Sequence, residues 1–515
     1  MQLPTRVEWA AAAVTAILLI LSFPNFDFAF LAWVALAPLM WVVARNPSPR
    51  RAFILGWTAG TIFFYGSCYW LTYSMINYGG LPTVLAYLLL IPGAVVVGIF
   101  PGLFTLVLAV AVRRFGVWAV LTAPVIWTAF EWTRLGVTGQ LWNALGYSQA
   151  YHRIVIQPAN WGGVYAVSFL IVTINAVLAL VLLKRNVWAI VTALVIAPAV
   201  FFVILLAPFT RTEQWVSSDE VHSSVAVIAI QPNVPMKLEK STDEMNALRE
   251  RHLALSKAAL AKVPEGRRLV IWPESPMNFS YASDRSFHEW VAQFARDHHT
   301  SLIFNSLEPA GPDAYYNSAL LINEEGRMIA QYDKIRLMPF GEYVPLPQWL
   351  PGASLITAIV GDFTPGDKYT LMPVGKYRAG VFICIESAYP WIARGLTNEG
   401  ADTLINISND GYLGPTAVMR QHLANAIFRA VENGRPVLRV TNSGVSARID
   451  GIGRIDEQTG AFQEDVRYWT IGPSMIASTF YSRHGDLFVQ ICAAITVIIL
   501  LTALLTGRRS LRQTG

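Results

Sequence analysis

Three side chains suited to covalent acyl chemistry follow short apolar runs in the second half of the 515-residue chain. Glu274 follows the run 270–273, Lys334 comes 60 residues later, and Cys384 follows the run 381–383, a further 50 residues along. A carboxylate can act as a base, an ammonium group can stabilise an oxyanion, and a thiol is a nucleophile. These residue types predict a cysteine nucleophile with its base and cation, although the sequence alone does not place them in contact.

Each of these residues also has a plainer interpretation. A single cysteine at a strand end is usually an inert apolar residue, and Glu274 and Lys334 taken singly resemble solvated loop charges. Glu342 lies among the apolar and turn residues of 338–345, which argues against simple solvation. Glu386 comes two residues after the thiol and shares its side if the strand continues. Alternatively, Glu386 bonds to local backbone within a turn.

Other catalytic motifs are missing from the sequence. The eight histidines show no H-E-x-x-H spacing, no glycine-rich phosphate loop carries the required lysine, and no G-x-S-x-G motif occurs. We therefore predict neither a metal nor a cofactor. The net charge of +5 is small and the basic residues form no continuous face, so nucleic acid is not an expected partner.

Glu274, Lys334 and Cys384 belong to a chain whose composition is typical of membrane proteins. Hydrophobic residues make up 54% of it and charged residues only 14%, with a mean hydropathy of +0.42. A membrane-crossing helix needs roughly 20 apolar residues. We predict eight spans, at residues 8–24, 27–44, 54–76, 81–112, 116–132, 162–183, 187–208 and 486–506. Pro92 and Pro101 predict a kinked or tilted single helix for the long fourth span.

Basic residues in the connecting loops predict the orientation. They follow the second, fourth, sixth and last spans, whereas the short loops 24–27 and 77–80 contain neither Lys nor Arg. By the positive-inside rule, both termini are cytoplasmic and residues 211–484 lie outside the membrane. We predict a bundle of seven helices over 1–210, an external domain over 211–484, and a transmembrane helix with a basic tail over 485–515.

The external part has the pattern of an α/β domain. Short β-branched runs bounded by turn residues alternate with helical patterns, and continuous apolar strands of this kind are typical of sheets covered by helices. The predicted strands are 225–230, 268–272, 301–304, 319–322, 380–384 and 402–406, and the predicted helices are 241–262, 285–298 and 416–433. At about 260 residues, this part is long enough to bury its own core.

Taken together, these motifs resemble a known family. The elements WPE (272–274), YDK (332–334), PFGE (339–342) and CIE (384–386) resemble the nitrilase superfamily, which uses a Glu-Lys-Cys triad on an α-β-β-α sandwich. A membrane bundle joined to such a domain resembles the apolipoprotein N-acyltransferase family. Further similarities are LAWVALAPL (31–39), FEWTR (130–134), WNALGYSQ (142–149), GVYAVSF (163–169), IQPNVP (230–235) and RAVENGRP (429–436).

The resemblance implies a two-step acyl transfer in the bacterial inner membrane, with the catalytic domain in the periplasm. Cys384, activated by Glu274, would take an acyl chain from a phospholipid such as phosphatidylethanolamine. Lys334 would stabilise the oxyanion, and a thioester would form. Glu342 and Glu386 match residues that the family uses around its triad, so the resemblance implies supporting roles for both. The acceptor would be the α-amino group of the diacylglyceryl cysteine of an apolipoprotein. The resemblance also implies a monomer.

Substrate-handling residues are expected near this site. The segment 408–414 contains Asn409 and has Tyr412 where the family often has Trp, and another family Trp is replaced near Lys240. These departures affect the expected acyl-chain or lipoprotein preference. Trp349 and Leu350 belong to the apolar, proline-rich stretch 346–359, which we interpret as a mobile arm that admits acyl chains. The alternative is an ordinary packed loop.

Two other functions remain open at this point. A membrane-tethered amidase or nitrilase hydrolysing a small C–N substrate would suit the same triad but not the membrane motifs. A transporter is disfavoured, because the spans contain few of the charges that mark transport paths. Glu131 and Arg134 lie near a predicted span end and are interpreted as an interfacial pair.

Overall fold

The chain divides into two compact units. The computed structural model describes residues 3–139, 141–210, 224–237, 241–274, 279–311, 314–339, 341–343, 363–474 and 476–512. Unit 1 comprises Met1–Arg211, Thr416–Ala424 and Thr479–Gly515, and unit 2 comprises Thr212–Pro415 and Asn425–Ser478. Residues 416–424 therefore belong with the two ends of the chain, although both flanking segments belong to unit 2.

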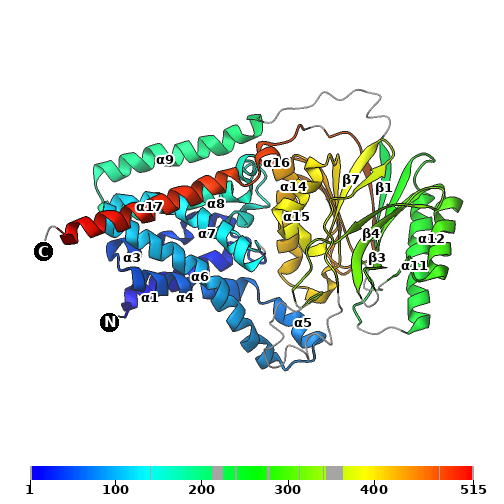
Figure 1. Ribbon diagram of the computed structural model, residues 1–515, viewed down its shortest axis with the longest axis horizontal. Coiled ribbons are helices and arrows are strands. Elements are labelled where there is room, and N and C mark those ends of the chain that lie inside the picture. Colours follow the sequence, from blue (N-terminus) through cyan, green and yellow to red (C-terminus); the bar gives the residue numbers. More distant parts are fainter. Residues whose placement is uncertain are drawn as a thin grey trace. The chain divides into compact units, whose positions relative to one another are not determined.

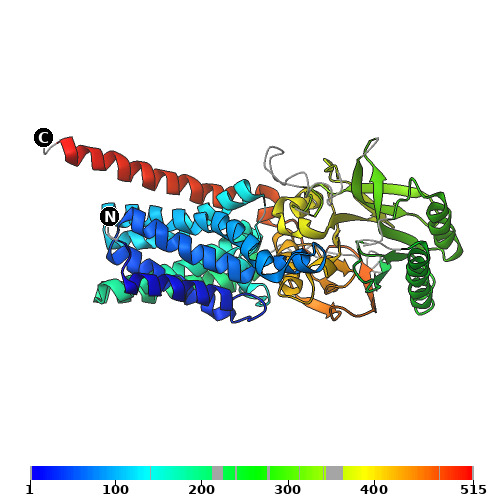
Figure 2. The same cartoon turned by 90° about the horizontal axis from the view of Figure 1, so that it is seen from below.

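Unit 1 is built from helices, because long apolar stretches satisfy their backbone hydrogen bonds internally. Its long helices run side by side in two perpendicular views (Figures 1 and 2). The helices are α1 (Arg6–Leu21), α2 (Ala32–Ala35), α3 (Ala37–Arg45), α4 (Pro49–Ser67), α5 (Leu71–Asn77), α6 (Thr83–Phe115), α7 (Ala123–Thr138), α8 (Ala159–Lys184), α9 (Val187–Leu206), α16 (Phe480–His484) and α17 (Leu487–Arg512).

Four described helical stretches are long and apolar enough to cross a membrane, namely Thr83–Phe115, Ala159–Lys184, Val187–Thr210 and Leu487–Leu505. The other predicted spans are shorter or divided. The stretch 27–44 is divided between α2 and α3, next to Pro38, whose ring nitrogen cannot donate a helical hydrogen bond. The count of eight spans stays a prediction. The fourth span is one helix of 33 residues, α6, with Pro92 and Pro101 inside it, as predicted.

The segment 416–424 is attached to unit 1 by Gln421. Its side-chain Oε1 accepts hydrogen bonds from Trp70 Nε1 at 3.0 Å and Trp142 Nε1 at 2.8 Å. Its Nε2 donates to the carbonyls of Pro24 and Ser67, each at 3.0 Å. A buried amide with all of these partners is held in one orientation, because losing any of them leaves a buried polar group unpaired. Local sequence patterns do not predict this attachment.

Unit 2 is a four-layer α-β-β-α sandwich (Figure 1). One sheet has the strand order β12-β1-β2-β3-β4-β5 and the other β11-β10-β9-β8-β7-β6. The strands are β1 (Val225–Gln231), β2 (Arg268–Ile271), β3 (Ser301–Pro309), β4 (Tyr315–Ile322), β5 (Met328–Asp333), β6 (Leu371–Val374), β7 (Tyr377–Ile383), β8 (Thr403–Ser408), β9 (Val437–Thr441), β10 (Ala447–Ile449), β11 (Ile455–Gln458) and β12 (Asp465–Ile471).

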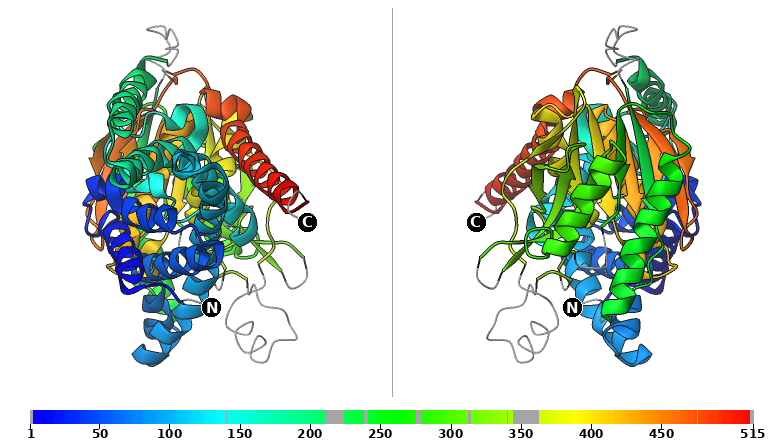
Figure 3. Two further views of the ribbon diagram at one scale, coloured as in Figure 1. Left: turned by 90° about the vertical axis from the view of Figure 1, so that its left-hand side faces the viewer. Right: turned by 90° about the vertical axis from the view of Figure 1, so that its right-hand side faces the viewer.

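Helices cover the outer faces of the two sheets. The helices of unit 2 are α11 (Thr242–Leu260), α12 (Arg285–Asp297), α14 (Pro390–Asn398) and the greater part of α15 (Val418–Asn433). The green helices α11 and α12 lie across the first sheet (Figure 3, right), where Trp272 and Phe287 belong to the shared apolar core. The Trp272 indole N–H donates to Ser256 on α11 at 2.9 Å, which fixes the end of β2 just before Glu274.

Strand direction brings the catalytic candidates to strand ends. β2 and β3 are parallel, and β3 and β5 both run antiparallel to β4, so β2 and β5 end at the same edge of their sheet. Glu274 follows β2 and Lys334 follows β5 at this edge. In the second sheet, β7, β8 and β9 are parallel, so Cys384 and Asn409 follow strands that also end together. Ligand sites in α/β folds favour such carboxyl ends of strands.

Candidate active site

The ammonium group of Lys334 lies between two carboxylates. Its Nζ is 2.9 Å from Glu342 Oε1 and 3.4 Å from Glu274 Oε1, and the lysine side chain is only 1% exposed. A buried ammonium is costly unless it is paired. Burial by itself lowers the pKa of Lys334, but Glu274 and Glu342 outweigh it, so the pKa lies well above its usual value. Lys334 is therefore a permanent cation in this site.

An asparagine holds the two carboxylates together. Asn317 Nδ2, on β4, donates to Glu274 Oε1 at 3.0 Å and to Glu342 Oε1 at 2.6 Å. Its own Oδ1 accepts from Asn305 Nδ2 on β3 at 2.7 Å, which fixes the direction of the amide. The second oxygen of Glu274, Oε2, accepts the backbone N–H of Asn409 at 3.1 Å. Glu274 is thus oriented from both sheets.

Cys384 occupies a strained turn at the end of β7. Its φ is +52°, which is uncommon for a residue other than glycine, and the helical turn Cys384–Ala388 begins at this residue. Strain of this kind persists only where the surroundings impose it, and it clusters at functional sites. Asn406 Nδ2 on β8 lies 3.2 Å from the Phe382 carbonyl oxygen and 3.5 Å from that of Cys384. The half-buried thiol is held at the tip of this turn.

The thiol is neutral at rest. Burial raises the pKa of Cys384 far above its usual value, the charge of Glu274 raises it further, and Lys334 acts in the opposite direction. A thiol attacks as thiolate, so this cysteine needs a base that removes its proton during the reaction. Glu274 is the carboxylate whose charge acts most strongly on the thiol, which makes it the candidate for this base.

Glu386 links the turn at Cys384 to the segment that carries Lys334. Its carboxylate accepts the Tyr332 hydroxyl at 2.9–3.0 Å and the backbone N–H groups of Ile335 at 2.8 Å, Arg336 at 3.0 Å and Ile383 at 2.7 Å. The strand ends at Ile383 and does not continue to Glu386, so the second alternative is confirmed: Glu386 bonds to local backbone within a turn. Its carboxylate also connects the turn at Cys384 to the segment that carries Lys334.

The raised pKa of Glu386 predicts that the stability of the fold depends on pH. Burial raises it from 4.5 to about 7, against the opposing effect of its hydrogen bonds. Because the folded pKa exceeds the unfolded one, the contribution of this group to stability is fully present below pH 4.5 and is lost as the pH rises through 7. The loss is about 3 kcal/mol. Thermal unfolding in detergent at pH 5 and pH 8 should show a smaller pH dependence for Glu386→Gln than for the unaltered chain.

The exposed Glu289 provides the matched control for this prediction. Its side chain is 64% exposed on α12, so Glu289→Gln should leave the pH dependence of unfolding unchanged. Parallel curves for the unaltered chain and Glu386→Gln would contradict the prediction.

The predicted substrate residues fall into three groups. Asn409 contacts the triad through its backbone N–H, while its side chain is bound to Met236, Gly411 and Asn442. Tyr412 is 40% exposed, in a turn directly after Asn409 and Asp410. Trp349 and Leu350, together with the whole predicted arm 346–359, lie outside the described residues, as does Lys240.

Several residues of the site were not predicted from the sequence. Asn305, Asn317, Asn406 and Ser408 are polar residues inside strands that otherwise read as buried and apolar. A polar side chain at a fully buried strand position must find a hydrogen-bond partner. This conflict between position and polarity was the available signal.

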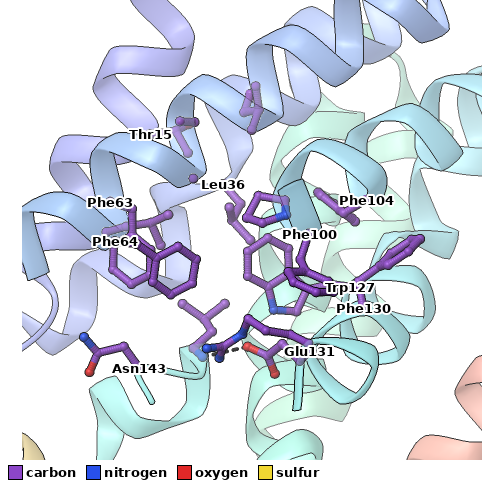
Figure 4. A pocket seen from close by; sticks show the side chains of 17 residues that line it. Thr15, Leu36, Phe63, Phe64, Phe100, Phe104, Trp127, Phe130, Glu131 and Asn143 are labelled. Atoms are coloured by element: carbon purple, nitrogen blue, oxygen red, sulfur yellow. Dashed lines mark hydrogen bonds between the residues drawn. The ribbon is translucent and has the colours of Figure 1, made fainter. Parts of the chain in front are cut away.

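A separate cavity lies within unit 1, between α1, α3, α4, α6 and α7 (Figure 4). Its empty volume is about 570 Å³, and Phe63, Phe104 and Trp127 are among its mostly apolar lining residues. Glu131 and Arg134 also line it and are only 6% and 3% exposed. Their interpretation as an interfacial pair stays a prediction, but both side chains are buried within the bundle. They lie on one face of α7, three residues apart, and that face points into the bundle.

Comparison with known proteins identifies the family to which the chain belongs. Residues 15–177 match the family model of the apolipoprotein N-acyltransferase N-terminal domain, and residues 224–481 match that of the carbon-nitrogen hydrolases. An apolipoprotein N-acyltransferase of Geobacter metallireducens is 33% identical over 518 residues, which cover 99% of this chain and 97% of the relative. The chain belongs to the apolipoprotein N-acyltransferase family. It is an acyltransferase of the carbon-nitrogen hydrolase superfamily.

Other relatives agree. An apolipoprotein N-acyltransferase of Azotobacter vinelandii is 31% identical over 490 residues, with 91% of this chain and 90% of that protein covered. A nitrilase-superfamily structure from Saccharomyces cerevisiae is 20% identical, with a TM-score of 0.39, and covers 49% of this chain and 92% of that one. The hydrolase match contains Glu274, Lys334 and Cys384, whereas the N-terminal match lies wholly within unit 1. The family resemblance is confirmed for both parts of the chain.

Proposed function

We propose that this chain transfers a fatty acyl group from a phospholipid to the α-amino group of the N-terminal S-diacylglyceryl cysteine of apolipoproteins, through a thioester on Cys384. Membership of the apolipoprotein N-acyltransferase family over nearly the full length carries this proposal. The site supports it, because a neutral thiol, a carboxylate and a fixed cation are the groups that covalent acyl transfer requires.

In the first step, Glu274 takes the proton of the thiol as Sγ bonds to the ester carbonyl carbon. The negative charge then develops on the carbonyl oxygen, where the Lys334 ammonium stabilises it in a dry surrounding. The bond from carbon to the glycerol oxygen breaks, and Glu274 gives its proton to that oxygen. A lysophospholipid leaves, and the acyl group remains on Cys384.

In the second step, the free amine of the lipidated cysteine attacks the thioester carbonyl. Lys334 again stabilises the oxyanion, the carbon–sulfur bond breaks, and the proton from the amine returns through Glu274 to the sulfur. This order is chemically downhill, because a thioester is more reactive toward amines than an oxygen ester and the amide product is stable. Exclusion of water protects the intermediate from hydrolysis.

The proposed location follows from the basic loops. The bundle would lie in the bacterial inner membrane with both termini cytoplasmic, and residues 211–484 would lie on the periplasmic side. Both substrates are anchored in lipid, so a site outside the membrane but next to its outer leaflet suits them. The proposed working form is a monomer, and residues 346–359 with Trp349 and Leu350, together with Tyr412, are proposed to handle the acyl chains.

Intact-protein mass spectrometry of the chain purified from its native membrane tests the proposal. We expect an added mass of one fatty acyl group that is absent from Cys384→Ala and is discharged by a lipidated cysteine peptide. The other two cysteines, Cys68 and Cys492, provide the control, because a variant with both replaced by alanine should keep the adduct. Discharge by water alone would indicate a lipid hydrolase. Ammonia release from amides without any adduct would indicate the tethered amidase.

A further inference from the structure

A fully buried ion pair is connected to the turn that carries Cys384 through the side chain of Asn406. Arg439 on β9 is 0% exposed and Asp410, just after β8, is 1% exposed. The guanidinium Nη2 is 2.6 Å from Asp410 Oδ2, and Nη1 donates to Asn406 Oδ1. No step of the proposed reaction uses either charge. A buried pair of this kind contributes little net stability compared with apolar residues of similar volume. Stability alone therefore does not explain why the pair is there.

Both arms of the guanidinium lead to the nucleophile. Through Nη1, Arg439 fixes Asn406, whose Nδ2 faces the carbonyl oxygens of Phe382 and Cys384. Through Nη2, it fixes Asp410, whose Oδ1 accepts the Ser408 hydroxyl at 2.9 Å. Ser408 in turn interacts with the thiol, and the charge of Asp410 acts on the same thiol. The ion pair is therefore connected to Cys384 in two ways, through Asn406 to the backbone and through Ser408 to the sulfur.

Carboxylates outnumber cations around the thiol, and Arg439 offsets part of this negative charge. Glu274 follows β2, Lys334 follows β5 and Asp410 follows β8, and all three act on the pKa of the thiol. Glu342, from the turn after Lys334, shares the ammonium with Glu274. Glu386 lies in the helical turn that begins at Cys384. With Arg439 removed, the negative charge of Asp410 would lose the guanidinium that pairs with it at 2.6 Å.

We propose that Arg439 is a positioning residue for the nucleophile, which cancels the charge of Asp410 beside the thiol and holds Asn406 against the backbone of Cys384. This inference rests on the proposed role of Cys384 as the nucleophile. It assigns a function in thiolate formation to the pair, and it predicts opposite effects for the two members when each is neutralised alone.

The test measures alkylation of Cys384 by iodoacetamide as a function of pH in the full-length protein in detergent. Any thioester is first removed with hydroxylamine, and mass spectrometry of the Cys384 peptide separates this thiol from Cys68 and Cys492. Asp410→Asn removes a negative charge next to the thiol and should raise the alkylation rate near pH 8 roughly three- to tenfold. Arg439→Met exposes that charge and should lower the rate by a similar factor.

The double variant R439M/D410N keeps the experiment decisive if Arg439→Met folds poorly. It removes both charges of the pair together, so it should fold, and its rate should return to within about threefold of the unaltered chain. The matched control is the pair Arg429–Glu432 on α15, which is 0% exposed on both sides and 2.8 Å apart. R429M/E432Q should leave the pH profile of Cys384 alkylation unchanged.

A purely structural role would give a different pattern. Both single variants would then alkylate in step with their loss of thermal stability, and Asp410→Asn would not be faster than the unaltered chain; either result would overturn the inference. Alkylation does not depend on acyl transfer. If the expected order of rates is found but no acyl adduct forms on Cys384, the proposed function fails while the inference about Arg439 stands.

Discussion

Replacing Glu274 by glutamine is expected to slow the acylation of Cys384 by about 100- to 10,000-fold, the range typical of removing a general base. The thiol is neutral at rest because burial raises its pKa, so the reaction depends on a group that accepts its proton. Glutamine keeps the size of Glu274 and one oxygen for Lys334 and Asn317, so the fold should survive. The rate of adduct formation from phospholipid, followed by mass spectrometry, measures the effect.

A second buried carboxylate in the same sheet provides the control. Glu308 on β3 is 5% exposed and accepts hydrogen bonds from Ser306 and Tyr281, whereas the carboxylate with the largest effect on the thiol of Cys384 is Glu274. Glu308→Gln should therefore acylate at the rate of the unaltered chain. Equal rates for Glu274→Gln and Glu308→Gln would remove Glu274 from the role of base.

Replacing Lys334 by methionine is expected to have two separate effects. The tetrahedral oxyanion loses its cation, which should lower the acylation rate about 100- to 1,000-fold. Glu274 and Glu342 also lose the ammonium between them. Breaking a buried ion pair by removing one partner costs about 3–5 kcal/mol, so the unfolding temperature in detergent should fall as well. Rate and unfolding temperature are both measured on the same preparation.

A second variant separates the two effects. In K334M/E342Q, one of the two carboxylates facing each other is neutral, so much of the lost stability should return. Acylation should remain slow, because the oxyanion still has no cation. Recovery of acylation together with stability would show that Lys334 only holds the site together. The Asn317 amide, which donates to both carboxylates, stays in place in both variants.

Local patterns allowed much of this chain to be predicted from its sequence. Each of the six predicted strands matches a strand of the sandwich to within a few residues, and the helices 241–262 and 285–298 match α11 and α12. Periodicity and β-branched composition report such elements, because they depend on neighbouring residues. The types and order of Glu274, Lys334 and Cys384 were equally visible, since each one directly follows a strand.

Boundaries depended on more distant contacts. The predicted span 27–44 is divided between α2 and α3, and α1 ends at Leu21 rather than at residue 24. Hydropathy averages over a window and does not show where a proline or a neighbouring helix ends an element. Glu131 and Arg134 illustrate the same limit, because the hydropathy of α7 does not say which of its faces points into the bundle.

The sequence by itself determined the family, the α/β character of one half, the helical character of the other, and the three groups that would carry the chemistry. Only the tertiary structure decided how these groups are used. It placed Asn317 between two carboxylates, Glu386 between the turn at Cys384 and the segment of Lys334, Arg439 against Asp410 and Asn406, and Gln421 within the helical unit. The physical reason is that a pKa, a strained φ or a buried ion pair depends on residues distant in sequence, whose meeting is set by sheet topology and not by local pattern.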